Sequence, residues 1–138
     1  MSIPLTDISR CLQGEIPSVL ATCSASGEPN VIHISQVIVV DEDHVATSNQ
    51  FFSKTSANLA ENPIATLVCL HPDTGLSYKF LIQLERSERS GPLFDVVHTD
   101  LDAIATMTGM ENVFALRAID IFRVLDVSEV PSKGTVAR

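Results

Sequence analysis

The stretch NQFFSKTSANL, residues 49–59, marks the point where an expected strand gives way to an expected helix. Ser53 or Thr55 can cap the free backbone N–H groups at the helix start, and Pro63 ends the helix. A helix N-terminus carries partial positive charge, so Lys54 and the neighbouring hydroxyl groups can hold a phosphate there. Taken alone, the stretch is equally typical of an ordinary capped helix with a solvated lysine.

On both sides of this stretch, short runs rich in β-branched residues alternate with turn signals. The expected strands are residues 18–23, 30–40, 44–48, 64–70, 78–85 and 118–125. One helix is expected over residues 6–13, and a longer one begins at Pro92 and ends near Gly109. Strands in hairpin order with peripheral helices predict an α+β, mainly β fold built on an antiparallel sheet or barrel.

The composition indicates one domain with a substantial core, since 45% of the 138 residues are hydrophobic. We place this domain at residues 1–127 and expect residues 128–138 to form a flexible C-terminal tail, because periodicity is lost and turn formers appear there. A formal charge of −8 argues against a nucleic-acid partner. No apolar run approaches a membrane span and the first residues lack a secretion signal, so we expect a cytoplasmic protein without a membrane partner.

The chain offers little local evidence for catalytic or metal-binding side chains. Its three cysteines are widely spaced in apolar surroundings, as is typical of core residues. Its four histidines show no metal-ligand spacing, so we expect no metal site. His33 is more typical of a hydrogen-bonded residue than of a catalytic one, and the catalytic residues stay unknown. The phosphate-binding loop of nucleotide-triphosphate enzymes and the nucleophile elbow of hydrolases are both absent.

The arrangement as a whole resembles the FMN-binding split-barrel family, which includes pyridoxamine 5′-phosphate oxidase and small flavin-binding proteins. The resemblance covers about residues 14–127 and is carried by residues 27–30, the turn at 41–43 and the stretch 53–63. It implies an antiparallel split β-barrel with peripheral helices and FMN as cofactor. It also implies a homodimer with a flavin at the subunit interface.

The resemblance further implies which residues bind the flavin. In this family the residues corresponding to Ser53, Lys54 and Thr55 hold the FMN phosphate, and positions on the preceding strands contact the ring. The implied cofactor-binding residues are Ser35, Gln36, Val37, Ser48, Asn49, Ser53, Lys54, Thr55 and Asn58. The chain departs from the family oxidases in one respect, because we find no counterpart of their carboxy-terminal arginine and histidine set for the pyridoxal phosphate substrate.

We therefore expect a flavoprotein, an oxidoreductase of unknown substrate that exchanges electrons with a small-molecule donor or acceptor. One alternative is a non-catalytic flavin-binding sensor or interaction domain. Another is a split barrel that holds a deazaflavin or a haem in the same groove.

Overall fold

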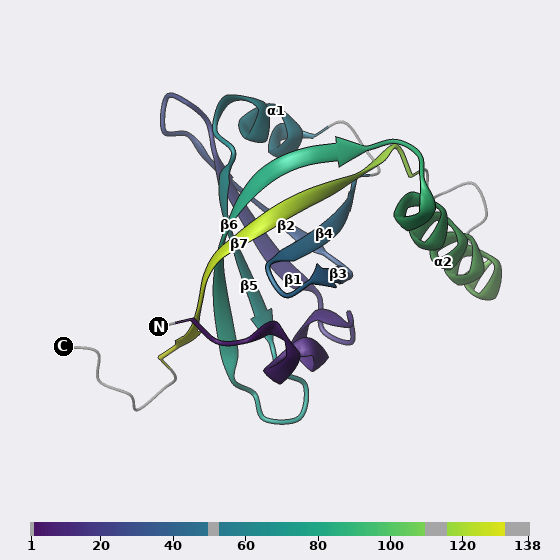
Figure 1. The fold of residues 1–138 in the computed structure, drawn as a ribbon, viewed down its shortest axis with the longest axis horizontal. Helices are drawn as coiled ribbons and strands as arrows, with labels where there is room; N and C mark the ends of the chain where they lie inside the picture. The colour runs from purple at the N-terminus through teal and green to yellow at the C-terminus, as the bar shows by residue number, and fades with distance from the viewer. Residues whose placement is uncertain (1, 50–52, 110–115, 132–138) are drawn as a thin grey trace.

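The computed structural model describes residues 2–49, 53–109 and 116–131. Within these residues, seven strands form one antiparallel sheet in the order β2-β1-β5-β6-β7-β4-β3. The order ends at β2 and β3, so the curved sheet is a split barrel rather than a closed one (Figure 1). The strands are β1 Ser18–Cys23, β2 Pro29–Ile34, β3 Val37–Asp41, β4 His44–Asn49, β5 Ile64–Leu70, β6 Ser77–Glu88 and β7 Ala118–Val130. The expected antiparallel split barrel with peripheral helices is confirmed.

Two α-helices lie at the periphery of the described barrel, α1 Lys54–Glu61 and α2 Pro92–Thr108. Figure 1 shows α1 at one end of the barrel and α2 to the side, between the ends of β6 and β7. The predicted N-cap of α1 is confirmed, because Ser53 Oγ accepts a hydrogen bond of 3.2 Å from the backbone N–H of Ser56. The predicted limits of α2 are also confirmed, with Pro92 in the first turn and Gly109 as the C-cap.

The predicted helix over residues 6–13 is wrong in type. The chain forms two short 3₁₀ helices there, η1 Leu5–Asp7 and η2 Ser9–Leu12. Ile8 interrupts them with φ −127° and ψ 18°, outside the helical region. Ile8 is itself buried in the core, so packing against the barrel overrides the local helical pattern.

Two strand predictions also need correction. The single strand expected over residues 30–40 is two strands, because the chain leaves the β1 side of the sheet after β2 and pairs with β4 on the opposite side. Residues 128–130, which were expected in the C-terminal tail, belong to β7 instead, because β7 stays paired with β6 up to Val130, opposite Ser77. Residues 132–138 lie outside the described part of the chain.

The core lies inside the barrel, between the curved sheet and the 3₁₀ helices. Phe80, Ile82 and Phe122 from β6 and β7 are fully buried at its centre. Cys11 and Cys69 are free thiols in the same core, and burial raises the pKa of both. These thiols therefore contribute as small apolar groups, as the sequence predicts, and not as nucleophiles.

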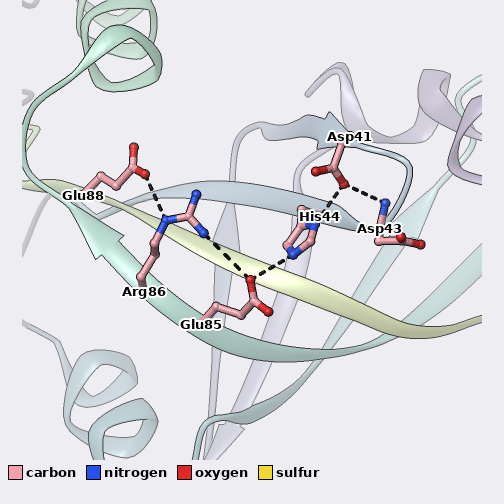
Figure 2. A network of polar contacts seen from close by, with 6 residues as sticks. All are labelled: Asp41, Asp43, His44, Glu85, Arg86 and Glu88. Atoms are coloured by element: carbon pink, nitrogen blue, oxygen red, sulfur yellow. Dashed lines mark hydrogen bonds and ion pairs between the residues drawn. The ribbon is translucent and has the colours of Figure 1, made fainter.

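A network of charged side chains ties the turn between β3 and β4 to β6 (Figure 2). His44 Nδ1 lies 2.8 Å from Asp41 Oδ1, and His44 Nε2 lies 2.8 Å from Glu85 Oε1. The same Asp41 oxygen accepts a hydrogen bond from the backbone N–H of Asp43. The hydrogen bond with Asp41 raises the pKa of His44, and the backbone N–H of Asp43 lowers the pKa of Asp41. The network thus favours a protonated imidazole between two carboxylates.

This network makes stability depend on pH in a definite direction. Because the folded-state pKa of His44 is raised, its pairs stabilise the fold fully below the unfolded pKa of about 6.5, and the contribution is lost as the pH rises through the folded-state pKa. We expect the loss in unfolding free energy caused by His44→Gln to be larger at about pH 5.5 than at about pH 9. Urea titrations of both proteins at both pH values measure this. An equal loss at the two pH values contradicts the prediction.

Gly14 packs against the break between β2 and β3. Its φ is +88°, and a Cβ atom built on it would lie 2.4 Å from the backbone oxygen of Ser35. Gly27 has a nearly identical φ of +89°, but a Cβ atom there would meet nothing within 4 Å. Gly14 is therefore required both by its positive φ and by the lack of space for a Cβ atom, whereas Gly27 is required by its positive φ alone.

We expect Gly27→Ala to lower the unfolding free energy by about 1 to 2 kcal/mol, the usual cost of a left-handed L-residue. Gly14→Ala should cost clearly more, because the added methyl group also displaces the Ser35 carbonyl. Denaturant titrations of the two variants and the wild type give the comparison. Equal losses of unfolding free energy in the two variants would show that the backbone at Ser35 moves away from the added methyl group without cost.

Candidate functional site

A polar cavity lies between β2, β4, β7 and the first turn of α1. Its volume is about 420 Å³, within the range of about 300 to 1,000 Å³ that is typical of small-molecule sites. Leu20, Ile32 and Ile34 supply its apolar lining, and β4 and α1 supply most of the polar groups. Such a cavity suits a small ligand that has both apolar and polar groups.

The first turn of α1 builds the polar end of the cavity. Ser53 is held by its capping hydrogen bond to Ser56 N–H. Thr55 Oγ1 accepts a hydrogen bond of 3.1 Å from Asn30 of β2, and Ser56 Oγ accepts one of 3.2 Å from Asn49 of β4. Each of these hydroxyl groups keeps its own hydrogen for donation. Together with the positive end of the helix dipole, they form a donor set that fits an anion.

Lys54 is the first residue of α1, but its side chain does not line the cavity. Its ammonium group pairs with the Glu28 carboxylate, and the two side chains are 45% and 63% exposed. A surface ion pair of this kind contributes at most about 1 kcal/mol, so an anion in the cavity can compete with Glu28 for the lysine. Lys54, the residue predicted to bind the phosphate, thus lies beside the cavity, and the Glu28 carboxylate competes with an anion for its ammonium group.

Of the other predicted residues, Ser35, Ser48 and Asn49 line the cavity together with Ser53 and Thr55. Ser35 and Ser48 also line a smaller cavity of about 120 Å³, which extends to α2. Gln36 lines this smaller cavity and not the cavity at the start of α1. At the break between β2 and β3, Ser35 therefore borders both cavities and Gln36 borders only the smaller one.

Val37 and Asn58 lie in the interior instead. Val37 is 3% exposed and belongs to the barrel core. Asn58 is 1% exposed, and its amide donates a hydrogen bond of 3.2 Å to Thr22 Oγ1 on β1. Both positions support the walls of the site, and their expected contact with a cofactor stays a prediction.

The sequence interpretation missed Asp120, a buried carboxyl group on the cavity wall. Asp120 is 8% exposed, and Ser87 Oγ donates a hydrogen bond of 2.6 Å to its Oδ1 atom. Burial raises the pKa of Asp120, while the contacts with Ser87 and Asn49 act in the opposite direction. The signal was present in the sequence, because Asp120 interrupts an otherwise apolar run over residues 118–122.

No group of three or more His, Cys, Asp or Glu side chains that could hold a metal ion occurs in the part of the chain that the structure describes. Across the same described residues, no helix is long and apolar enough to cross a membrane. The Asp41, His44 and Glu85 side chains satisfy one another within the network of Figure 2. The cavity at the start of α1 is the candidate site because it brings together most of the residues that were predicted to bind a cofactor.

Comparison with known proteins gives the chain a family. The family model described as pyridoxamine 5′-phosphate oxidase matches residues 6–109. An FMN-binding protein from Syntrophomonas wolfei subsp. wolfei is similar in structure, with a TM-score of 0.77, 22% identity, and coverage of 97% of this chain and 88% of that chain. No curated protein matches the sequence.

Two further solved structures share the fold. An F420 reductase is 14% identical with a TM-score of 0.63, covering 90% of this chain and 94% of that chain. HutZ, the haem storage protein from Vibrio cholerae, is 18% identical with a TM-score of 0.55, covering 81% of this chain and 84% of that chain. At these identities the structural likenesses show the fold alone.

Proposed function

The chain belongs to the pyridoxamine 5′-phosphate oxidase family, and on that premise we propose that it is an FMN-binding flavoprotein, an oxidoreductase of a small-molecule donor or acceptor. The observation that carries the proposal is the cavity at the start of α1, where hydroxyl groups and the helix N-terminus form an anion-binding end. When bound, FMN supplies electron or hydride transfer at its ring system. The protein then has to bind the flavin, orient it and control what reaches it.

The residues present fit FMN by their chemistry. Thr55 and Ser56 offer hydroxyl donors for a phosphate, with Lys54 beside them. Ile32 and Ile34, which are partly buried, offer apolar surface for a flat aromatic ring. We do not extend the proposal to pyridoxamine 5′-phosphate as substrate, because the chain lacks a counterpart of the oxidases' substrate-binding arginine and histidine set.

A homodimer with the flavin at the subunit interface is part of the proposal. A cross-strand row on the outer face of the sheet runs through Val31, Ala21, Thr66 and Leu81 on β2, β1, β5 and β6. Val31 is 61% exposed and Leu81 is 41% exposed. Exposed apolar side chains on the face of a sheet suit burial against a second copy of the chain, and a twofold dimer is the commonest way to achieve it.

The cellular setting that we propose is the cytoplasm. Cys11 and Cys69 are free thiols in the core, and free buried thiols are typical of a reducing compartment. An electron-transferring flavoprotein would find its small-molecule partners there.

Haem is the second candidate ligand, favoured by one observation. His33 of β2 lines the cavity, and an imidazole there can serve as an axial ligand of haem iron. A deazaflavin in the same cavity, or a flavin held without catalysis by a sensor or interaction domain, fits the same walls. The ligand spectrum separates flavin, deazaflavin and haem.

We expect FMN added to the purified protein to bind with quenching of the flavin fluorescence, and haem to give no stable complex. A binding titration followed by absorption and fluorescence measures both ligands. Haem binding that is lost in His33→Ala, together with no response to FMN, would favour the haem alternative instead.

Substitutions at Lys54 and Glu28 test the proposed binding of the FMN phosphate. Lys54→Ala should weaken FMN binding about tenfold or more, since a charge-assisted hydrogen bond contributes about 1.5 to 3 kcal/mol. Glu28→Gln should tighten binding by up to about fivefold, because the lysine no longer has a competing carboxylate. Riboflavin, which has no phosphate, serves as the control ligand, and neither substitution should change its affinity. A parallel change with riboflavin would place the effect elsewhere than at the phosphate.

The dimer prediction rests on Leu81. We expect Leu81→Arg to weaken dimerisation about a hundredfold or more, because burying an unpaired charge costs about 3 to 5 kcal/mol. Met107→Arg on α2 is the matched control, since Met107 is an apolar side chain that is 85% exposed and distant in sequence from the row. Sedimentation velocity over a range of concentrations gives the oligomeric state of both variants. A Leu81→Arg protein that stays as dimeric as Met107→Arg contradicts the proposed interface.

A further inference from the structure

Asp120 presents a buried carboxyl group to the cavity. It lies on β7, 8% exposed, and lines the cavity proposed for the flavin. In the sheet it is paired with Thr47 of β4 on one side and Ser87 of β6 on the other. The 2.6 Å hydrogen bond from Ser87 Oγ fixes the carboxyl group in place. A polar group held this way at a ligand cavity is in position to contact what the cavity binds.

The surroundings of Asp120 leave its charge without a cationic partner in the described cavity wall. From β4, Thr47 and Asn49 are neutral, and from β6 the facing group is the Ser87 hydroxyl. From β2, His33 is the other titratable side chain among the described residues that line the cavity, and α1 contributes hydroxyl groups. Burial raises the pKa of Asp120, and its two polar contacts counteract this. A carboxyl group balanced in this way responds to small changes around it.

A bound flavin phosphate changes those surroundings in one direction. Filling the cavity removes water from an already buried carboxylate, which disfavours the charged form. The FMN phosphate adds a charge of about −1.5 to −2 in the same cavity, and a neighbouring like charge acts the same way. Both effects favour a neutral Asp120 in the complex. A neutral carboxyl group has an O–H to donate, so it suits an acceptor atom on the ligand.

Resting on the proposed flavin function, we propose that Asp120 is a ligand-binding residue that takes up one proton from solvent when FMN binds and donates the resulting O–H to an acceptor atom of the flavin ring. The cavity thereby selects ligands that present a carbonyl oxygen or a ring nitrogen at this position. The proton comes from water or buffer, one O–H bond forms on the carboxyl group, and no other bond changes.

The test compares wild type with Asp120→Asn, which has the same shape but does not titrate. FMN affinity is measured by fluorescence quenching from about pH 5 to about pH 8. The side-chain amide of the Asp120→Asn variant cannot take up a proton, so the ratio of the two affinities reports how the Asp120 carboxyl group contributes to the pH dependence. We expect wild-type affinity to rise relative to the variant as the pH falls, by up to about tenfold per pH unit. Calorimetry in two buffers of different ionisation enthalpy should show correspondingly greater proton uptake by the wild type.

Ser87→Ala provides a second variant that keeps the carboxyl group. Removing the Ser87 donor takes a hydrogen bond away from the ionised form, so the pH dependence should move to higher pH. Riboflavin, which adds no phosphate charge, should show a smaller proton uptake than FMN in the wild type. The thermal unfolding of each empty variant confirms that the fold is intact.

The outcomes are distinct. If FMN binds wild type and Asp120→Asn with the same pH profile, or if wild-type affinity rises with pH relative to the variant, the Asp120 proposal is overturned and the flavin assignment stands. If neither FMN nor riboflavin binds either protein at any pH, the flavin assignment fails and the proton linkage falls with it. A profile that differs as expected and shifts in Ser87→Ala supports the proposal.

Discussion

The site depends on one backbone constraint, the close approach of Gly14 to the carbonyl oxygen of Ser35. Ser35 lies between β2 and β3, which follow each other in the chain but occupy opposite edges of the sheet. The chain must therefore pass from one edge of the sheet to the other at this point, and Gly14 leaves space for this crossing because it has no Cβ atom. The crossing brings the ends of β2 and β4 to one cavity, and both strands are tied to α1 by hydrogen bonds to Thr55 and Ser56.

Strand β7 contributes side chains both to the core and to the cavity wall. Along β7, Phe122 faces the core and is fully buried among apolar side chains, while Asp120 lies two residues earlier and faces the cavity. Burial of Asp120 without a counter-ion costs stability, and the Ser87 hydroxyl offsets only part of that cost. A sheet optimised for stability alone would place an apolar residue there. A buried carboxyl group at this position is consistent with the ligand-binding role proposed for Asp120.

Much of this structure could be predicted from the sequence, because local physical signals determine it. The 64–70 strand and both ends of α2 follow from β-branched runs, Pro92 and Gly109. The break between β2 and β3 could not, since the run over residues 30–40 is rich in β-branched residues throughout and only the pairing with different partners interrupts it. The same limit applies to the site. The Lys54 pairing with Glu28 and the Asp120 bond with Ser87 join residues far apart in the chain, and local pattern does not reveal them.

The overall charge of −8 is compatible with the proposed binding of an anion in the cavity because electrostatic influence is local. At physiological ionic strength, exposed charges more than about 8 Å apart are largely screened, so the acidic surface has little effect on the start of α1. Two nearby carboxylates matter more. Glu28 engages the lysine that an anion would use, and Asp120 adds negative charge within the cavity. Under the proposed function, an anionic ligand has to displace Glu28 from Lys54 and favours the neutral form of Asp120, so these two carboxylates influence its affinity as much as the groups that hold it.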